Sequence, residues 1–164
     1  MKITARGEYG SRAMIELALQ WGLGVVPLSA IAAKQGIPRK FLEQLVADLR
    51  NAHLVHASRG AMGGYQLVRE PARITLLEIV EALEGPLMIM DCEQSPGEPC
   101  GLWNGCGLRD TWATMERRAR DVLAETTLQD LADRQRERER ETAPRTGLEV
   151  ISVRTEAKRN EERV

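Results

Sequence analysis

Three cysteines, Cys92, Cys100 and Cys106, lie close together in the second half of this 164-residue chain. Seven residues separate the first two and five separate the last two, and glycines are frequent among them. Thiolate sulfur binds soft metals, and glycine lets backbone N–H groups come close enough to donate hydrogen bonds to the sulfur. The pattern predicts a soft-metal site, with an iron–sulfur cluster as its leading occupant.

Zinc and unligated thiols are the alternatives at these positions. Structural zinc sites usually contain closely paired cysteines, and this sequence has no such pair. Three thiolates leave one position for a fourth ligand or for a small molecule, because metals bound by sulfur commonly take four ligands. An incomplete site of this kind suits a sensor of nitric oxide or oxygen.

A second set of residues has the chemistry to contact DNA. Arg39, Lys40 and Gln44 fall on the outer side of a predicted helix, near its N-terminal end, where side chains can reach base edges in the major groove. Arg59, followed by Gly60 in a glycine-rich turn, is placed to enter the minor groove or to contact phosphate. Contacts to the DNA backbone are also expected from Lys2, Arg6 and Arg12.

The elements that must position these cations form a helix-turn-helix followed by a hairpin. Helical spacing of apolar residues predicts a first helix within 4–21, and a second begins at Ser29 and stops at Gly36. Pro38 belongs in the first turn of a third helix. That helix is expected to bury Phe41, Leu42, Leu45, Val46 and Leu49 and to turn Arg39, Lys40, Glu43, Gln44, Ala47 and Asp48 outward.

A hairpin and two further helices are predicted after the third helix. Strands over 54–58 and 65–68 flank the glycine-rich turn, and a capping box at Thr75 and Glu78 starts a helix that ends at Glu84. A longer helix over 108–125 carries an apolar seam with coiled-coil spacing, which favours pairing with a second copy of the chain. The seam consists of Leu108, Trp112, Met115, Ala119 and Val122.

The fold class is therefore predicted to be mainly α with a small β-hairpin: a winged helix-turn-helix plus a long dimerisation helix. A short helix over 128–135 follows the seam, and the residues beyond it are expected to be mostly disordered. The expected organisation is a DNA-binding domain over 1–73, a connecting helix over 74–90, a cysteine loop over 91–107, a dimerisation region over 108–135 and a tail over 136–164.

Charge is distributed unevenly along the chain, although the net charge is only −1. Residues 1–73 carry ten Lys and Arg against five Asp and Glu, whereas residues 74–134 carry five against twelve. A basic first half is suited to a polyanion. No signal peptide or membrane span is evident, so we expect a cytoplasmic protein with reduced thiols and no membrane partner. No catalytic motif is evident either, so an enzyme is not expected.

Three stretches of the sequence resemble a known family. They are Met1–Gly10 continuing to Ala13-Met14, Ile37–Leu45, and Ser58–Leu67. They resemble the first helix, recognition helix and wing of the IscR/NsrR/RirA-type winged-helix iron–sulfur transcriptional regulators, and the resemblance covers residues 1–135. The three cysteines are similar to those of the cluster-binding members and distinguish this chain from the related cysteine regulator CymR, which lacks them.

The resemblance implies that Cys92, Cys100 and Cys106 bind the cluster and that the long helix crosses its counterpart in a homodimer. In IscR a histidine three positions after the third cysteine completes the site, and here that position is Arg109, which cannot ligate. In NsrR a carboxylate near the N-terminus of the other subunit does so, and Glu8 occupies the matching position. Glu8 from the other copy is therefore expected as fourth ligand. A 4Fe–4S cluster is favoured, with 2Fe–2S as the alternative.

The function predicted from the sequence is a homodimeric repressor that binds an operator and senses redox state, nitric oxide or iron through its cluster. Two alternatives stay within DNA binding: an IscR-type regulator of iron–sulfur assembly genes, and a winged-helix regulator with structural zinc. An electron carrier is disfavoured because it would leave the basic wing unexplained.

Overall fold

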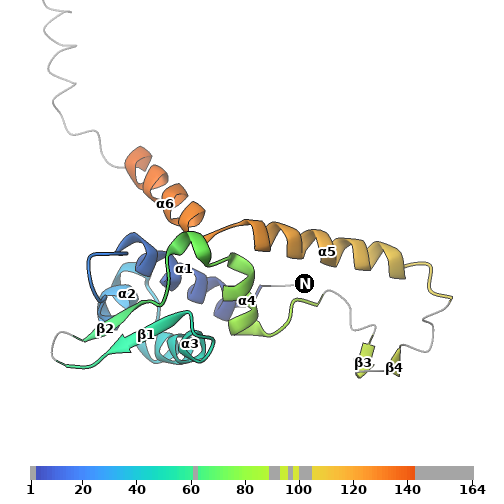
Figure 1. Cartoon of the computed structure of the whole chain (residues 1–164), viewed down its shortest axis with the longest axis horizontal. Helices are drawn as coiled ribbons and strands as arrows, with labels where there is room; N and C mark the ends of the chain where they lie inside the picture. Colours follow the sequence, from blue (N-terminus) through green and yellow to red (C-terminus); the bar gives the residue numbers. More distant parts are fainter. Residues whose placement is uncertain (1–2, 61–62, 89–92, 96–97, 100–104, 143–164) are drawn as a thin grey trace, which may run out of the picture. The chain divides into compact units, whose positions relative to one another are not determined.

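The computed structural model describes residues 3–60, 63–88, 93–95, 98–99 and 105–142 (Figure 1). Within these ranges the protein is mainly helical, with a small antiparallel hairpin, as the sequence predicts. The six α-helices are α1 (Ala5–Leu19), α2 (Leu28–Gln35), α3 (Arg39–Asn51), α4 (Leu76–Glu84), α5 (Arg109–Glu125) and α6 (Leu128–Thr142). By its contacts the chain divides into a unit of residues 1–133 and a second unit that starts at residue 134.

Helices α2 and α3 form the predicted helix-turn-helix. The turn between them contains Gly36 in the left-handed region, with φ of 63°, a conformation that costs glycine little. Two details of the prediction are wrong, because both helices are preceded by a proline at the N-cap. Pro27 occupies that position in α2, so Ser29 already lies inside the helix, and Pro38 occupies it in α3.

The hairpin pairs β1 (Val55–Ser58) with β2 (Gly64–Leu67), in a register that puts Val55 opposite Leu67. The hairpin is held against the start of α2, since Val26 and Tyr65 exchange two backbone hydrogen bonds of 2.8 and 2.9 Å. Glycine is required at position 64, where a Cβ would lie 2.5 Å from the carbonyl oxygen of Val26.

One hydrophobic core joins the helix-turn-helix to the hairpin and to α4. Burial of this much apolar surface is the main force that stabilises the domain. Helix α3 contributes Leu42, Leu45, Val46 and Leu49, as the sequence predicts, whereas Phe41 is half-buried and packs at the edge with its ring against Tyr9. Two residues from the start of α6, Leu128 and Ala132, are fully buried in the same core.

The segment after the hairpin is anchored by a 3-10 turn (Pro71–Arg73) and by the predicted capping box. Thr75 and Glu78 each bind the other's backbone N–H, so α4 begins where the sequence indicates. The starts of α4 and α6 are linked by two backbone hydrogen bonds of 2.8 Å, from Leu76 to Thr126 and from Leu128 to Ile74.

Two predictions for the second half need correction. The region predicted as loop over 91–107 contains two short paired strands, β3 (Glu93–Ser95) and β4 (Glu98–Pro99). Helix α6 continues past its predicted end at 135 to Thr142. The alternating charges after residue 135 were taken as a sign of disorder, but they are compatible with a solvated helix that contains pairs such as Gln135 with Glu139.

Among the described helices, none has both the length and the apolar character needed to cross a membrane.

Candidate functional site

The three residues expected to read bases lie exposed on the first turns of α3. Arg39, Lys40 and Gln44 are solvent-accessible, and Arg39 Nε donates a 3.1 Å hydrogen bond to Glu43 one turn further on. The opposite side of α3 is buried in the core. The helix therefore presents a polar face at its N-terminal end, which is the end that recognition helices insert into the major groove.

A groove separates this end of α3 from the hairpin. Its lining includes Ser29 at the start of α2, Arg39 and Glu43 on α3, and Arg59 and Gly60 in the hairpin turn. Arg59 is exposed, and Gly60 takes a φ of 119° that only glycine adopts without strain. The structure thus brings the predicted wing cation and the recognition helix to two sides of one groove.

The three cations predicted to contact the DNA backbone differ in their surroundings. Lys2 lies outside the described residues. Arg12 donates to Oε1 and to the carbonyl oxygen of Gln35, at 2.8 and 2.6 Å, and its guanidinium lies 5.6 Å from the centre of the Tyr9 ring. Its side chain is still 40% exposed, so it both braces the turn of the helix-turn-helix and meets solvent.

A buried carboxylate supports the same turn. Glu16 on α1 is only 4% exposed. It accepts a 2.6 Å hydrogen bond from Gln35 and pairs with Lys34 at 3.0 Å. A buried charge is tolerated only when it is paired and hydrogen-bonded, so these contacts fix the end of α2 against α1.

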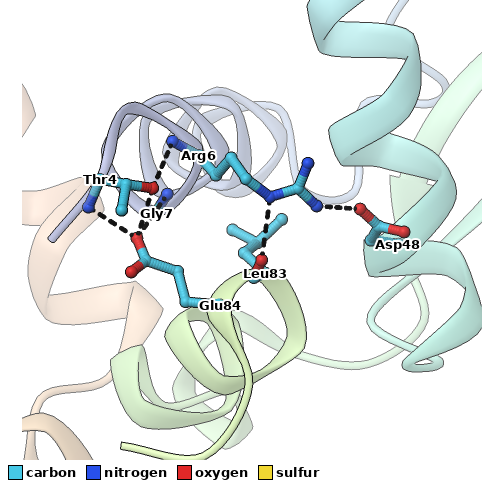
Figure 2. A network of polar contacts seen from close by, with 6 residues as sticks. All are labelled: Thr4, Arg6, Gly7, Asp48, Leu83 and Glu84. Carbon is cyan, nitrogen blue, oxygen red and sulfur yellow. Dashed lines mark hydrogen bonds and ion pairs between the residues drawn. The ribbon is translucent and has the colours of Figure 1, made fainter.

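Arg6 is committed to contacts inside the domain (Figure 2). Its guanidinium donates to the carbonyl oxygen of Leu83 at 3.1 Å and pairs with Asp48 at 2.5 Å. Asp48 was predicted to face outward on α3. It is instead half-buried and turned toward α1, because Arg6 provides a partner that the sequence of α3 alone does not reveal.

The cysteine site lies only partly within the described residues. Cys92 and Cys100 fall outside them, and Cys106 is half-buried just before α5. Glu8, the expected fourth ligand, is on α1 with a side chain 62% exposed, and lies 3.6 Å from Arg12. No cluster of three metal-ligating side chains occurs in the part of the chain that the structure describes. Three thiols and a carboxylate are nevertheless a donor set that fits iron.

The predicted seam on α5 is largely uncovered within one copy of the chain. Leu108, Met115 and Val122 are 59, 46 and 62% exposed. Leu123, on another side of the helix, is buried, and Arg120 pairs with Glu81 of α4 at 3.0 Å. One side of α5 therefore packs on α4, while the apolar seam meets no partner among the described residues.

Comparison with known proteins decides the family. A model described as Rrf2, an iron-dependent transcriptional regulator, matches residues 3–134. The chain belongs to the Rrf2 family. The protein is accordingly a winged-helix transcriptional regulator and not an enzyme, as the sequence predicts.

Individual relatives of this Rrf2 protein include two with solved structures. It is 42% identical over 132 residues to the regulator CymR of Bacillus subtilis, which covers 80% of this chain and 90% of CymR. The structure of CymR, described as the global cysteine regulator of B. subtilis, matches with a TM-score of 0.69, 41% identity and coverage of 81 and 97%. The IscR structure from T. potens matches with a TM-score of 0.68, 32% identity and coverage of 88 and 93%.

Sequence reasoning missed the residues that connect the elements. Glu84, Asp48, Glu16 and Gln35 all bind partners on another helix. One signal was available: Thr4 looks like an N-cap, but the position three residues later is Gly7 and not the glutamate that completes a capping box. The missing acid had to come from elsewhere in the chain.

Proposed function

We propose that this Rrf2-family regulator binds operator DNA as a homodimer and that an iron–sulfur cluster on Cys92, Cys100 and Cys106 controls the binding. The observation that carries the proposal is the groove where the exposed Arg39 of α3 faces the exposed Arg59 of the wing. Side chains at the N-terminal end of a recognition helix read bases, and a wing cation contacts phosphate or the minor groove.

The proposed contacts fall into two groups. Arg39, Lys40 and Gln44 read base edges and give sequence preference, because they are exposed on the leading turns of α3. The backbone group is expected to supply affinity without sequence information. It consists of Arg59, Gly60, Lys2 and Arg12. Arg6 was expected in this group, but its internal contacts favour a different role, which is developed below.

Support for the cluster comes from its donor set. Cys106 is half-buried beside the first turn of α5, where the helix dipole favours a thiolate. Glu8 is exposed on α1, so a second copy of the chain can reach its carboxylate. A bound cluster, 4Fe–4S in our preference and 2Fe–2S as the alternative, supplies iron that nitric oxide or oxygen can reach. Thiolate ligation of this kind suits the reducing cytoplasm.

Dimerisation is supported by the uncovered seam. An isolated monomer would leave Leu108, Met115 and Val122 in water. Apolar residues with this spacing associate by knobs-into-holes packing. Two recognition helices related by a two-fold axis would meet half-sites about one turn of DNA apart.

A second candidate is a regulator without a cluster, as expected of a CymR-like protein. The 42% identity to CymR favours it, whereas the cysteine spacing favours the cluster. A structural zinc site and control of iron–sulfur assembly genes are further variants of the same DNA-binding role.

An anaerobic ultraviolet–visible spectrum, recorded before and after stoichiometric nitric oxide, separates these candidates. A brown chromophore that nitric oxide bleaches, and that is lost in Cys106→Ser, is the expected result. Glu8→Ala should destabilise the chromophore. Protein that stays colourless after anaerobic reconstitution with iron and sulfide would leave the CymR-like or zinc-bound regulator.

A further inference from the structure

The N-terminus of α1 is capped by a residue eighty positions away (Figure 2). One carboxylate oxygen of Glu84 accepts hydrogen bonds from the backbone N–H of Thr4 at 2.9 Å, from the Thr4 hydroxyl at 3.1 Å and from the N–H of Gly7 at 3.0 Å. The first N–H groups of a helix have no partner within it. Glu84, the last residue of α4, satisfies them here.

Two glycines allow α4 to come this close. A Cβ at Gly7 would lie 2.3 Å from the same oxygen of Glu84, and one at Gly10 would lie 2.2 Å from Leu83 Cδ1. Any side chain at either position would force the two helices or their side chains apart. The glycine face of α1 therefore receives the end of α4 directly.

Arg6 extends this contact to the recognition helix. Its Nε donates to the last turn of α4 at the carbonyl oxygen of Leu83, and the same guanidinium pairs with Asp48 on α3. A cation at a helix C-terminus satisfies an unpaired carbonyl and interacts favourably with the helix dipole. One side chain thus connects the end of α4 to the middle of α3.

The two ends of this connection are functionally distinct. Residues 85–91 lead from Glu84 to Cys92, the first predicted ligand. Asp48 lies on the same rigid helix as Arg39, Lys40 and Gln44. A displacement of the end of α4 would therefore act on the helix that reads DNA.

We propose that Arg6 and Glu84 form a brace that positions the recognition helix and transmits movements of the end of α4 to it. The brace is defined by Thr4, Arg6, Gly7, Asp48 and Glu84. The transmission half of this proposal rests on the proposed cluster, and the positioning half does not. Arg6 is then a positioning residue and not a phosphate contact.

Salt dependence distinguishes a brace from a phosphate contact. Each phosphate contact contributes about 0.9 to the slope of log affinity against log salt concentration. Loss of a positioning residue lowers the affinity but leaves the slope unchanged. Asp48 gives the sharper contrast, because removing an anion beside DNA should strengthen binding on electrostatic grounds alone, whereas breaking the brace weakens it.

The experiment uses the full-length, metal-free protein and a duplex that the wild type enriches from a randomised library. Arg6→Gln and Asp48→Asn are both expected to weaken binding about five- to tenfold with the wild-type salt slope. Arg59→Gln is the matched cation control and should lower the slope by about 0.9. A lower slope in Arg6→Gln, together with unchanged or tighter binding by Asp48→Asn, would overturn the positioning role.

Hydrogen exchange supplies a second measurement that needs no DNA. Backbone amides of α3 should exchange faster in Arg6→Gln and Asp48→Asn than in the wild type, because the brace no longer restrains the helix. Thr75→Val, which removes only the local cap of α4, is the matched control and should leave exchange in α3 unchanged. Wild-type exchange in both brace variants would contradict the proposal.

Transmission is tested by the ratio of duplex affinities of the cluster-loaded and metal-free forms. Glu84→Ala should bring this ratio close to one while the chromophore stays at wild-type intensity. A wild-type ratio in Glu84→Ala would refute transmission. Absence of any chromophore in the wild type would instead refute the proposed cluster, and the metal-free experiments would still decide whether the brace positions α3.

Discussion

Helices α1 and α4 both open on a threonine N-cap, yet their caps are completed in different ways. In α4 the acid is Glu78, three residues after Thr75, and its carboxylate accepts from the Thr75 N–H at 2.9 Å. In α1 the acid is Glu84, eighty residues after Thr4. The chemistry is the same in both, since a carboxylate satisfies N–H groups at a helix start.

The difference lies in what each cap connects. The α4 cap stabilises its own helix and connects nothing else, apart from the pairing of Glu78 with Arg69. The α1 cap joins the first helix to the last turn of α4, and Arg6 continues the connection to α3. A local cap can be lost at the cost of stability alone, whereas loss of the distant cap should also change DNA binding.

Deletion of the two acids is the largest test of this contrast. Glu84→Ala should lower the free energy of unfolding by about 2 kcal/mol, because backbone N–H groups lose a charged acceptor. Glu78→Ala loses its own cap and the pair with Arg69 and should cost a similar amount. Urea denaturation measures both, and only Glu84→Ala should weaken duplex binding. Equal weakening in both variants would reduce the contrast to stability.

Replacement of the two threonines is the next test. Thr4→Val and Thr75→Val should each lower the free energy of unfolding by about 1 kcal/mol, the usual cost of a lost N-cap. In thermal denaturation the two variants should behave alike. Duplex affinity should fall in Thr4→Val alone, because only Thr4 shares its cap with α4. Unchanged affinity in Thr4→Val would argue that Glu84 alone maintains the connection.

Gly7→Ala should separate stability from function. The new Cβ would occupy the site of the Glu84 carboxylate oxygen and expel that exposed side chain at a cost of about 1–2 kcal/mol. Alanine in place of glycine within a helix returns about 1 kcal/mol. The net loss in unfolding free energy should be about 0.5 kcal/mol, with a clear loss of duplex affinity. Wild-type affinity would show that the cap is dispensable for DNA binding.

The smallest effect is expected from a local ion pair on α3. Arg39 and Glu43 are exposed and one turn apart, at 3.1 Å, and such pairs contribute about 0.3 kcal/mol. Glu43→Gln should leave the free energy of unfolding within that margin. Duplex binding should be equal or tighter, because Arg39 is released from a competing acceptor. Weaker binding would assign Glu43 a direct role in recognition.

Predictability from the sequence follows the same division. The third helix, the wing and the capping box of α4 depend on short-range patterns, and all are found where the sequence places them within a residue or two. The start of α2 and the extent of α6 were misjudged. A proline before α2 took the N-cap position assigned to Ser29, and alternating charge was compatible with a helix.

The candidate site divides in the same way. The exposure of Arg39, Lys40 and Arg59 follows from their places on a helix face and a turn. The internal use of Arg6 could not be predicted, because its partners on α3 and α4 are distant in the sequence. Residue types reveal a charge, but only tertiary contacts decide whether that charge meets solvent or another helix.

The place of Asp48 on α3 makes that helix a lever. Nine residues separate Asp48 from Arg39, a distance of about 13 Å along the helix axis. If the contact with Arg6 acts as the pivot, a tilt of about 10° would move the Arg39 end by about 2 Å over that length. A hydrogen bond to a base edge does not survive such a shift. A small loss of restraint far from the DNA would therefore be magnified at the residues that read it.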